Sequence, residues 1–277
     1  LVGSEMCIRD RVGAPGCRKL SCRYPYIRLE PLNHQVAEVC MVVTVQANAL
    51  RVRRSNKTIL DIPQLVIDER PTLLLGANGA GKSTLFSALA SDSSPKEGTV
   101  LREGSISIVE QKFNPITGFT SSEYCAYVAW LFGRDKKTAK KESLDWLDFV
   151  DLSRVSSQRC ESLSGGERSR LAIATALNSG AETLLLDEPS AALDPLNKEH
   201  VTEVYQRIVD RGHNLVVSTH DAGELQRPFE RVLVLDKGKL HFDGSRQDFV
   251  QLATESGNTP AHILSRSFVR RGNYSDS

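Results

Sequence analysis

The sequence lacks any apolar run long enough to cross a membrane. Its longest apolar runs, such as residues 72–75 and 183–186, have the length of a strand, whereas a transmembrane helix needs about 20 apolar residues. It also lacks an excess of either charge, since 35 Lys and Arg residues stand against 34 Asp and Glu residues. This balance gives no electrostatic reason to expect a nucleic-acid partner. We therefore expect another polypeptide to supply the membrane part of any membrane process.

Cysteine is scarce beyond residue 40, where only Cys125 and Cys160 occur, and this scarcity fits a reducing cytoplasm. The other four of the six cysteines lie in residues 1–40, which show no periodicity. A disulfide-linked module would need an oxidising compartment, and a zinc site would need closely paired cysteines, but the chain has no CxxC pair. Leu1–Arg11 resembles translated sequencing-adapter sequence. We expect residues 1–40 to be a disordered, non-native leader and Met41 to be the start.

From Met41 onward, short apolar segments alternate with longer amphipathic ones. The pattern predicts strands at 42–47, 64–67, 72–76, 105–110, 183–187, 214–219, 231–235 and 239–243. It predicts helices at 82–91, 121–132, 136–149, 165–178, 197–211, 221–226 and 245–253. Strand–loop–helix units in this order indicate an α/β fold with a mainly parallel sheet. Residues from about 115 to 178 lack strands and predict an inserted helical lobe, and residues 254–277 read as a polar tail.

A glycine-rich segment follows the strand predicted at 72–76 and precedes a helix. It matches the G-x-x-x-x-G-K-[ST] pattern, whose glycines let backbone amides wrap around phosphate oxygens at a helix N-terminus. We expect Lys82 to reach the β and γ phosphates and Ser83 to ligate Mg²⁺. A plain glycine-rich turn is the alternative, and the strand–loop–helix context argues against it. The predicted nucleotide-binding residues are Gly76, Ala77, Asn78, Gly79, Ala80, Gly81, Lys82, Ser83 and Thr84.

Two acids end the apolar strand predicted at 183–187. An acid at the end of a strand beside a phosphate loop can hold Mg²⁺, and Asp187 has that place. The next carboxylate, Glu188, can orient and deprotonate water. Between the two motifs, Ser164 and Glu167 fit a helix capping box, and capping need not exclude a role at a ligand.

Four segments in order resemble the ATP-binding cassette (ABC) ATPases: LSGGE at 163–167, LLLDEP at 184–189, SAALD at 190–194 and STH at 218–220. The resemblance covers Met41 to about residue 253, and it implies a P-loop NTPase fold that has an antiparallel β edge region in addition to the features above. It also implies that Leu163, Ser164, Gly165, Gly166 and Glu167 form a second anion-binding helix start, which acts on ATP bound by a partner chain.

The same resemblance assigns three further roles. Gln111 is similar to the glutamine that contacts Mg²⁺ and water, and His220 is similar to the switch histidine that holds Glu188 and water in line. Asp194 is similar to the residue that links two active sites across a dimer. An aromatic residue usually stacks on adenine in this family, and here alignment places Val52 at that position, flanked by arginines that could stack instead.

The resemblance implies an ATP- and Mg²⁺-dependent ATPase that works as a homodimer, or as a heterodimer with another ABC ATPase. Residues 112–133 are similar to the permease-facing surface of bacterial ABC-2-type exporter subunits. We therefore expect a cytoplasmic subunit held at the inner face of the plasma membrane by a separate permease. An import ATPase and a soluble non-transport ABC ATPase are the alternatives, while the LSGGE and SAALD segments argue against a generic phosphate-loop kinase or GTPase.

Overall fold

A computed structural model describes residues 43–91, 93–191 and 193–255. The predicted leader at 1–40 and residues 256–277 of the predicted tail lie outside the described residues. The first two residues of that tail belong to the last helix, α6 (Arg246–Glu255). Among the described residues, no helix combines the length and the apolar character that a bilayer crossing requires.

Six strands form the central sheet, in the order β5-β6-β7-β3-β8-β9. Five of them are parallel: β5 (Ile106–Val109), β6 (Thr183–Asp187), β7 (Asn214–Thr219), β3 (Thr72–Leu75) and β8 (Arg231–Asp236). The edge strand β9 (Lys239–Ser245) pairs antiparallel with β8. Since the carboxyl ends of β3, β6 and β7 lie at the same edge, the segments that follow them are brought together.

A second sheet is antiparallel and has the order β2-β1-β4. Its strands are β1 (Val43–Arg54), β2 (Lys57–Asp68) and β4 (Glu97–Arg102). A hairpin joins β1 to β2 through Ser55 and Asn56, both with positive φ, as a two-residue β-turn of this kind requires. Together with β9, this sheet supplies the antiparallel region that the family resemblance implied.

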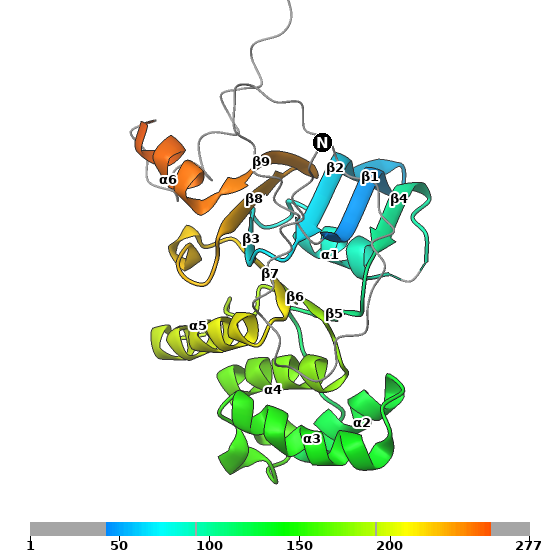
Figure 1. The fold of residues 1–277 in the computed structure, drawn as a ribbon, viewed down its shortest axis with the longest axis vertical. Coiled ribbons are helices and arrows are strands. Elements are labelled where there is room, and N and C mark those ends of the chain that lie inside the picture. The colour runs from blue at the N-terminus through cyan, green and yellow to red at the C-terminus, as the bar shows by residue number, and fades with distance from the viewer. Residues whose placement is uncertain (1–42, 92, 192, 256–277) are drawn as a thin grey trace, which may run out of the picture. The chain divides into compact units, whose positions relative to one another are not determined.

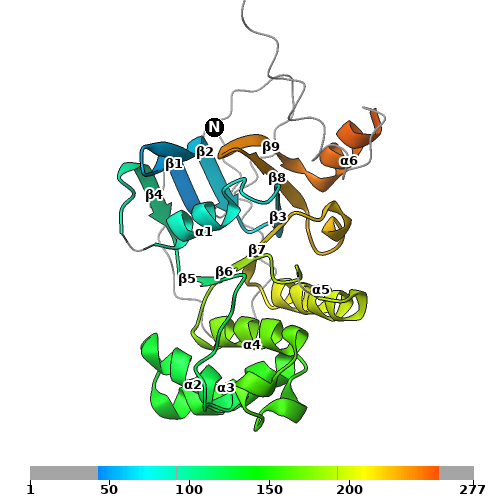
Figure 2. The same cartoon turned by 180° about the vertical axis from the view of Figure 1, so that it is seen from behind.

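Alternating side chains of the central sheet enter two hydrophobic cores, as the strand repeat of two residues dictates. Leu73 and Leu75 pack with the side carrying α4 (Gly165–Asn178) and α5 (Pro195–Asp210). Leu74 packs on the other face with α1 (Lys82–Ala90) and the antiparallel sheet. Figures 1 and 2 show α1 beside β1, β2 and β4, and α5 on the other side of the central sheet. The phosphate loop after β3 is therefore held between two packed layers.

Three helices form the lobe between β5 and β6, namely α2 (Ser121–Leu131), α3 (Lys136–Phe149) and α4. Figure 1 shows them grouped together, in green, below α5. At the base of the lobe, the guanidinium carbon of Arg211 lies 4.5 Å from the centre of the Phe149 ring and 5.0 Å from that of Trp146. Arg207 pairs with Asp151 beside them. These contacts join the lobe to the end of α5.

Three sequence predictions differ from the structure. The strand β4 was missed because its side chains are exposed or half-buried and give no apolar alternation. The strands β1 and β2 run further into their hairpin than the predicted ranges 42–47 and 64–67. The helix predicted at 221–226 is wrong, because only a 3-10 turn, η3 (Ala222–Glu224), forms there. The Asp221 carboxylate accepts the amide hydrogen of Gly223, and Leu225 leaves the helical region at ψ 67°, which ends the turn.

Candidate functional site

The phosphate loop between β3 and α1 is anchored at both ends by backbone hydrogen bonds. The amide of Gly76 donates to Thr219 O at 3.1 Å, and the amide of Gly238 donates to Ala80 O at 2.9 Å. Gly76 must be glycine, since a Cβ there would lie 2.6 Å from Leu235 O. Gly81 has a φ of 110° at the N-cap of α1, a conformation that other residues rarely adopt. The loop is thus a fixed backbone cradle in front of a helix N-terminus.

A pocket of about 360 Å³ lies at this cradle. No side chain caps the N-terminus of α1, so its first amides are available to an anion. The pocket is lined by Ile59, Asn78, Gly79, Gly81, Lys82, Ser83, Thr84, Gln111 and Glu188. Most of the residues predicted to bind nucleotide therefore border one pocket, together with the predicted base.

Lys82 and Glu188 form a buried ion pair at the back of this pocket. Lys82 Nζ lies 2.8 Å from Glu188 Oε1, and their side chains are 5% and 8% exposed. Nζ also donates to Gly76 O at 2.7 Å and to Ala77 O at 3.2 Å. Every hydrogen of this ammonium is engaged, so binding a phosphate requires Lys82 to exchange one of these partners for a phosphate oxygen.

The Glu188 carboxylate collects the remaining predicted groups. Its Oε2 accepts a hydrogen bond from Gln111 Nε2 at 3.3 Å and lies 3.1 Å from His220 Nδ1. These residues come from three different strand ends, those of β5, β6 and β7. The structure thus brings Lys82, Gln111 and His220 to the carboxylate of Glu188, and their catalytic roles stay predictions.

Ser218 holds both acids and was not singled out by the sequence. Its hydroxyl donates to Asp187 Oδ1 at 2.5 Å and accepts from the Glu188 amide at 3.1 Å. Glu188 has a φ of 47°, an unfavourable conformation for a residue with a side chain. The Ser218 contacts stabilise this turn, which aims the carboxylate at the pocket. No local sequence signal marks this contact, because it depends on β6 and β7 lying side by side in the sheet.

The residues predicted to hold Mg²⁺ offer only oxygen donors. Ser83 borders the pocket, Gln111 keeps its amide oxygen while its nitrogen binds Glu188, and Asp187 is buried with one oxygen on Ser218. Among the described residues, no cluster of three His, Cys, Asp or Glu side chains could hold a metal alone. This donor set fits Mg²⁺, which keeps waters and phosphate oxygens and needs few protein ligands.

The LSGGE segment, Leu163–Glu167, starts α4 away from the pocket, and none of its residues borders it. The Ser164 amide and hydroxyl donate to Glu167 Oε2 at 2.8 and 2.7 Å, and the Glu167 amide donates back to Ser164 Oγ at 3.3 Å. The hydrogen bonds from Ser164 lower the pKa of Glu167. The predicted capping box is therefore present, and the segment does not join the nucleotide site of its own chain.

Gly166 and Asp194 lie close together through Asn197. A Cβ on Gly166 would lie 2.4 Å from Asn197 Oδ1. Asp194 caps α5 by accepting from the Asn197 amide at 3.0 Å and from Asn197 Nδ2 at 2.7 Å. Hydrogen bonds from the Asn197 amide and side chain lower the pKa of Asp194. Asp194 is exposed and does not border the pocket.

Comparison with known proteins agrees with this geometry. Residues 66–191 match the family model described as ABC transporter. The chain is 33% identical, over 210 residues, to the phosphate import ATP-binding protein PstB 2 of Natronomonas pharaonis, a match that covers 66% of this chain and 73% of that protein. The chain belongs to the family of ABC transporter ATPases.

Other matches within the family differ in the transport that their names describe. The chain is 30% identical over 230 residues to the Nod factor export ATP-binding protein I of Neorhizobium galegae. That match covers 78% of this chain, but the chain spans only 65% of the relative's length. A solved structure, the dimeric bacterial ABC transporter cassette MJ0796, superposes with a TM-score of 0.64 at 25% identity, covering 73% of this chain and 98% of that chain.

In this ABC cassette, the position that alignment gives to the adenine-stacking residue lies outside the pocket. Val52 does not border the pocket and packs with the core formed by α1 and the antiparallel sheet. Ile59 borders the pocket instead. The strand pairing explains the change: Val52 pairs with Leu60 and Arg53 with Thr58, so a bulge leaves Ile59 unpaired. A bulge of one residue cannot be counted from the sequence.

Proposed function

We propose that the chain is the ATP-hydrolysing subunit of an ABC transporter that exports a substrate through a separate permease chain. The convergence of Lys82, Gln111 and His220 on Glu188, beside a phosphate cradle, carries the catalytic part of this proposal. Export is favoured by the similarity to a Nod factor export protein. Import is the second candidate, because the similarity to a phosphate import protein is of the same order.

Hydrolysis follows from the same contacts. When the phosphates of ATP occupy the amides of α1, Lys82 moves its charge from Glu188 to a phosphate oxygen. Glu188 is then a carboxylate without its cation, still fixed by Ser218, and it accepts a proton from water. His220 orients Glu188 and that water, and Gln111 donates to the carboxylate. Mg²⁺ held by Ser83, Asp187 and Gln111 would neutralise phosphate charge.

A dimer completes the site in this proposal. The LSGGE segment presents a helix N-terminus, with the Gly165 and Gly166 amides in its first turn, but it does not border the pocket of its own chain. A second copy, or a related ABC ATPase, can bring that N-terminus onto the γ-phosphate. The dimeric structure of the MJ0796 cassette supports an assembly of two such chains. Asp194, beside the segment, would lie near the second nucleotide.

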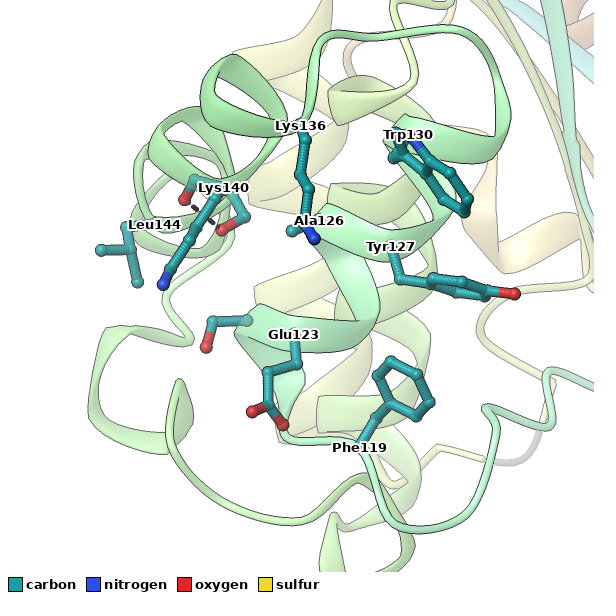
Figure 3. A pocket seen from close by; sticks show the side chains of 10 residues that line it. Phe119, Glu123, Ala126, Tyr127, Trp130, Lys136, Lys140 and Leu144 are labelled. Atoms are coloured by element: carbon teal, nitrogen blue, oxygen red, sulfur yellow. Dashed lines mark hydrogen bonds between the residues drawn. The ribbon is translucent and has the colours of Figure 1, made fainter.

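The helical lobe carries a surface suited to the permease. A pocket of about 570 Å³ lies between α2 and α3. Figure 3 shows Phe119, Tyr127 and Trp130 along one side of it and Lys140 and Leu144 along the other. Trp130, Leu131 and Phe132 are large apolar residues left about half exposed or more, as is typical of an interaction surface. Docking here would hold the subunit at the inner face of the plasma membrane.

Replacing the base tests the catalytic proposal. Glu188→Gln keeps the shape of the side chain but removes its ability to take a proton. We expect phosphate release to fall by at least about 100-fold, while ATP binding, measured by calorimetry, persists. Undiminished phosphate release in the purified variant would overturn the role of Glu188.

Co-purification tests the transport part. The full chain, carrying an affinity tag, is expressed in bacterial cells together with any multi-span membrane protein found encoded next to its gene, and membrane complexes are isolated through the tag. We expect Trp130→Glu to lose the membrane protein and to keep ATPase activity, whereas Lys137→Glu on the exposed face of α3 serves as the control. If neither protein retains the other, the transport proposal is wrong. If the complex forms, the direction of substrate flux in vesicles separates export from import.

A further inference from the structure

Glu224 is a buried carboxylate that the catalytic proposal does not use. It ends the 3-10 turn η3, four residues after His220, and its side chain is only 13% exposed. Its Oε1 accepts a hydrogen bond from Ser190 Oγ at 2.6 Å, whereas Oε2 is buried without a hydrogen bond. Burial raises the pKa of this carboxyl. Burying a carboxylate with an unpaired oxygen destabilises the folded state, so the contacts of Glu224 need an explanation.

The partner of Glu224 lies in the turn that follows the base. Ser190 is two residues after Glu188 and is 3% exposed. The Ala191 amide donates to Glu188 O at 3.2 Å, and the Leu193 amide donates to Ser190 O at 3.1 Å. Ser190 therefore sits at the centre of a tight turn whose shape fixes the backbone of Glu188 on one side and leads to Asp194 on the other.

Lys198, in the first turns of α5, makes a second connection to the same segment. Its Nζ lies 3.1 Å from Asp221 Oδ2 and 3.9 Å from Glu224 Oε1. Asp221 directly follows His220, and its amide donates to Thr219 Oγ1 at 3.0 Å. Lys198 thus ties the start of α5 to the segment that follows His220, and none of these residues borders the pocket.

We propose that Glu224 is a positioning residue: through its hydrogen bond with Ser190 it sets the distance between Glu188 and His220, and so the rate of ATP hydrolysis. This inference rests on the proposed roles of Glu188 and His220. Without the bond, Glu188 is still held to the end of β7 through Ser218, but the turn after Glu188 loses its hydrogen bond to the turn after His220. Misplacing a base by about 1 Å can cost about 100-fold in rate.

The test compares kcat, KM and thermal stability of purified variants. Glu224→Ala and Ser190→Ala should each lower kcat by about 10-fold or more while KM for ATP stays within about 2-fold, since neither residue borders the pocket. Glu224→Gln should recover most of the rate, because its amide oxygen still accepts from Ser190. The double variant Glu224→Ala with Ser190→Ala should be no slower than the slower of the two single alanine variants, because the two residues form one contact.

Combination with His220→Ala separates positioning from a merely structural role. In that background, Glu224→Ala should lower the residual rate by less than about 2-fold, since the distance it sets no longer matters. A full additional loss, or an unchanged kcat in both single variants, would overturn the inference. If Glu224→Ala does not fold, Ser190→Ala decides alone. If Glu188→Gln turns over ATP normally, the proposed function fails instead, whatever the Glu224 variants show.

Discussion

Two helices of this chain begin in a glycine-containing motif, and their N-termini are satisfied in opposite ways. The helix α1 begins after Gly81, has no side-chain cap and has no acid in its first turn. The helix α4 begins after Ser164, which forms a complete capping box with Glu167. The first end borders the pocket at the phosphate loop of its own chain, and the second does not border that pocket.

This difference indicates different functions for the N-termini of α1 and α4. An uncapped N-terminus leaves amide donors and a partial positive charge that an anion can neutralise, so α1 is suited to hold phosphate in the single chain. A capped N-terminus is stable without a ligand, so α4 can remain folded before a partner chain brings its bound nucleotide to this helix start. In the proposed dimer, each chain would therefore contribute one phosphate cradle and one half-site.

The largest effect should come from the open end. Lys82→Ala removes the cation that would bind phosphate and leaves the buried Glu188 carboxylate without the ammonium paired to its Oε1. We expect the dissociation constant for ATP, measured by calorimetry, to rise by at least about 100-fold. Lys137→Ala, on the exposed face of α3, is the control and should bind ATP like the wild type. Normal ATP binding by the Lys82 variant would show that the α1 end is not the phosphate site.

The capped end should respond in turnover and not in binding. Ser164→Arg places a bulky cation at the start of α4, so we expect ATP binding within about 3-fold of wild type and hydrolysis reduced by at least about 100-fold. The matched control is Thr120→Arg, which breaks an equivalent capping box with Glu123 at the start of α2. If both variants hydrolyse ATP at the wild-type rate, α4 is only a capped helix and the half-site does not exist.

The comparison also explains what the sequence could and could not predict. Local rules located both helix starts and the capping box of Ser164, whereas Gln111 and His220 were identified through the family resemblance. Three features depend on nonlocal pairing and left no local signal: the exposed edge strand β4, the bulge that presents Ile59, and the hydroxyl of Ser218 beneath the two acids. These three features are determined by sheet register and by contacts between strand ends. Neither can be predicted from the residues of a single segment.

Low pH should reduce the stability that the capping box of α4 contributes, an effect smaller than those of the two substitutions above. Hydrogen bonds from Ser164 lower the pKa of Glu167 below its ordinary value of 4.5, so its stabilising effect is complete above that pH and is lost as the pH falls through the lowered value. Glu167→Gln keeps an acceptor that does not titrate. We expect the difference in unfolding free energy between wild type and this variant, measured with urea, to be constant near neutral pH and to fall below about pH 4.5. Glu167→Ala should cost about 1 kcal/mol near neutral pH, and a pH-independent difference would contradict the capping account.

The smallest effect should come from the wall of the open end, where this chain has Ile59 and no aromatic side chain borders the pocket among the described residues. Ile59→Tyr adds a ring at the pocket, and stacking on a purine is worth about 1 kcal/mol, so we expect ATP to bind about 5-fold more tightly. Val52→Tyr is the control: its side chain packs into the core, so it should lower stability without a gain in affinity. If Val52→Tyr tightens binding and Ile59→Tyr does not, the bulge in β2 does not present Ile59 to the base, and phosphate contacts at α1 alone account for nucleotide affinity.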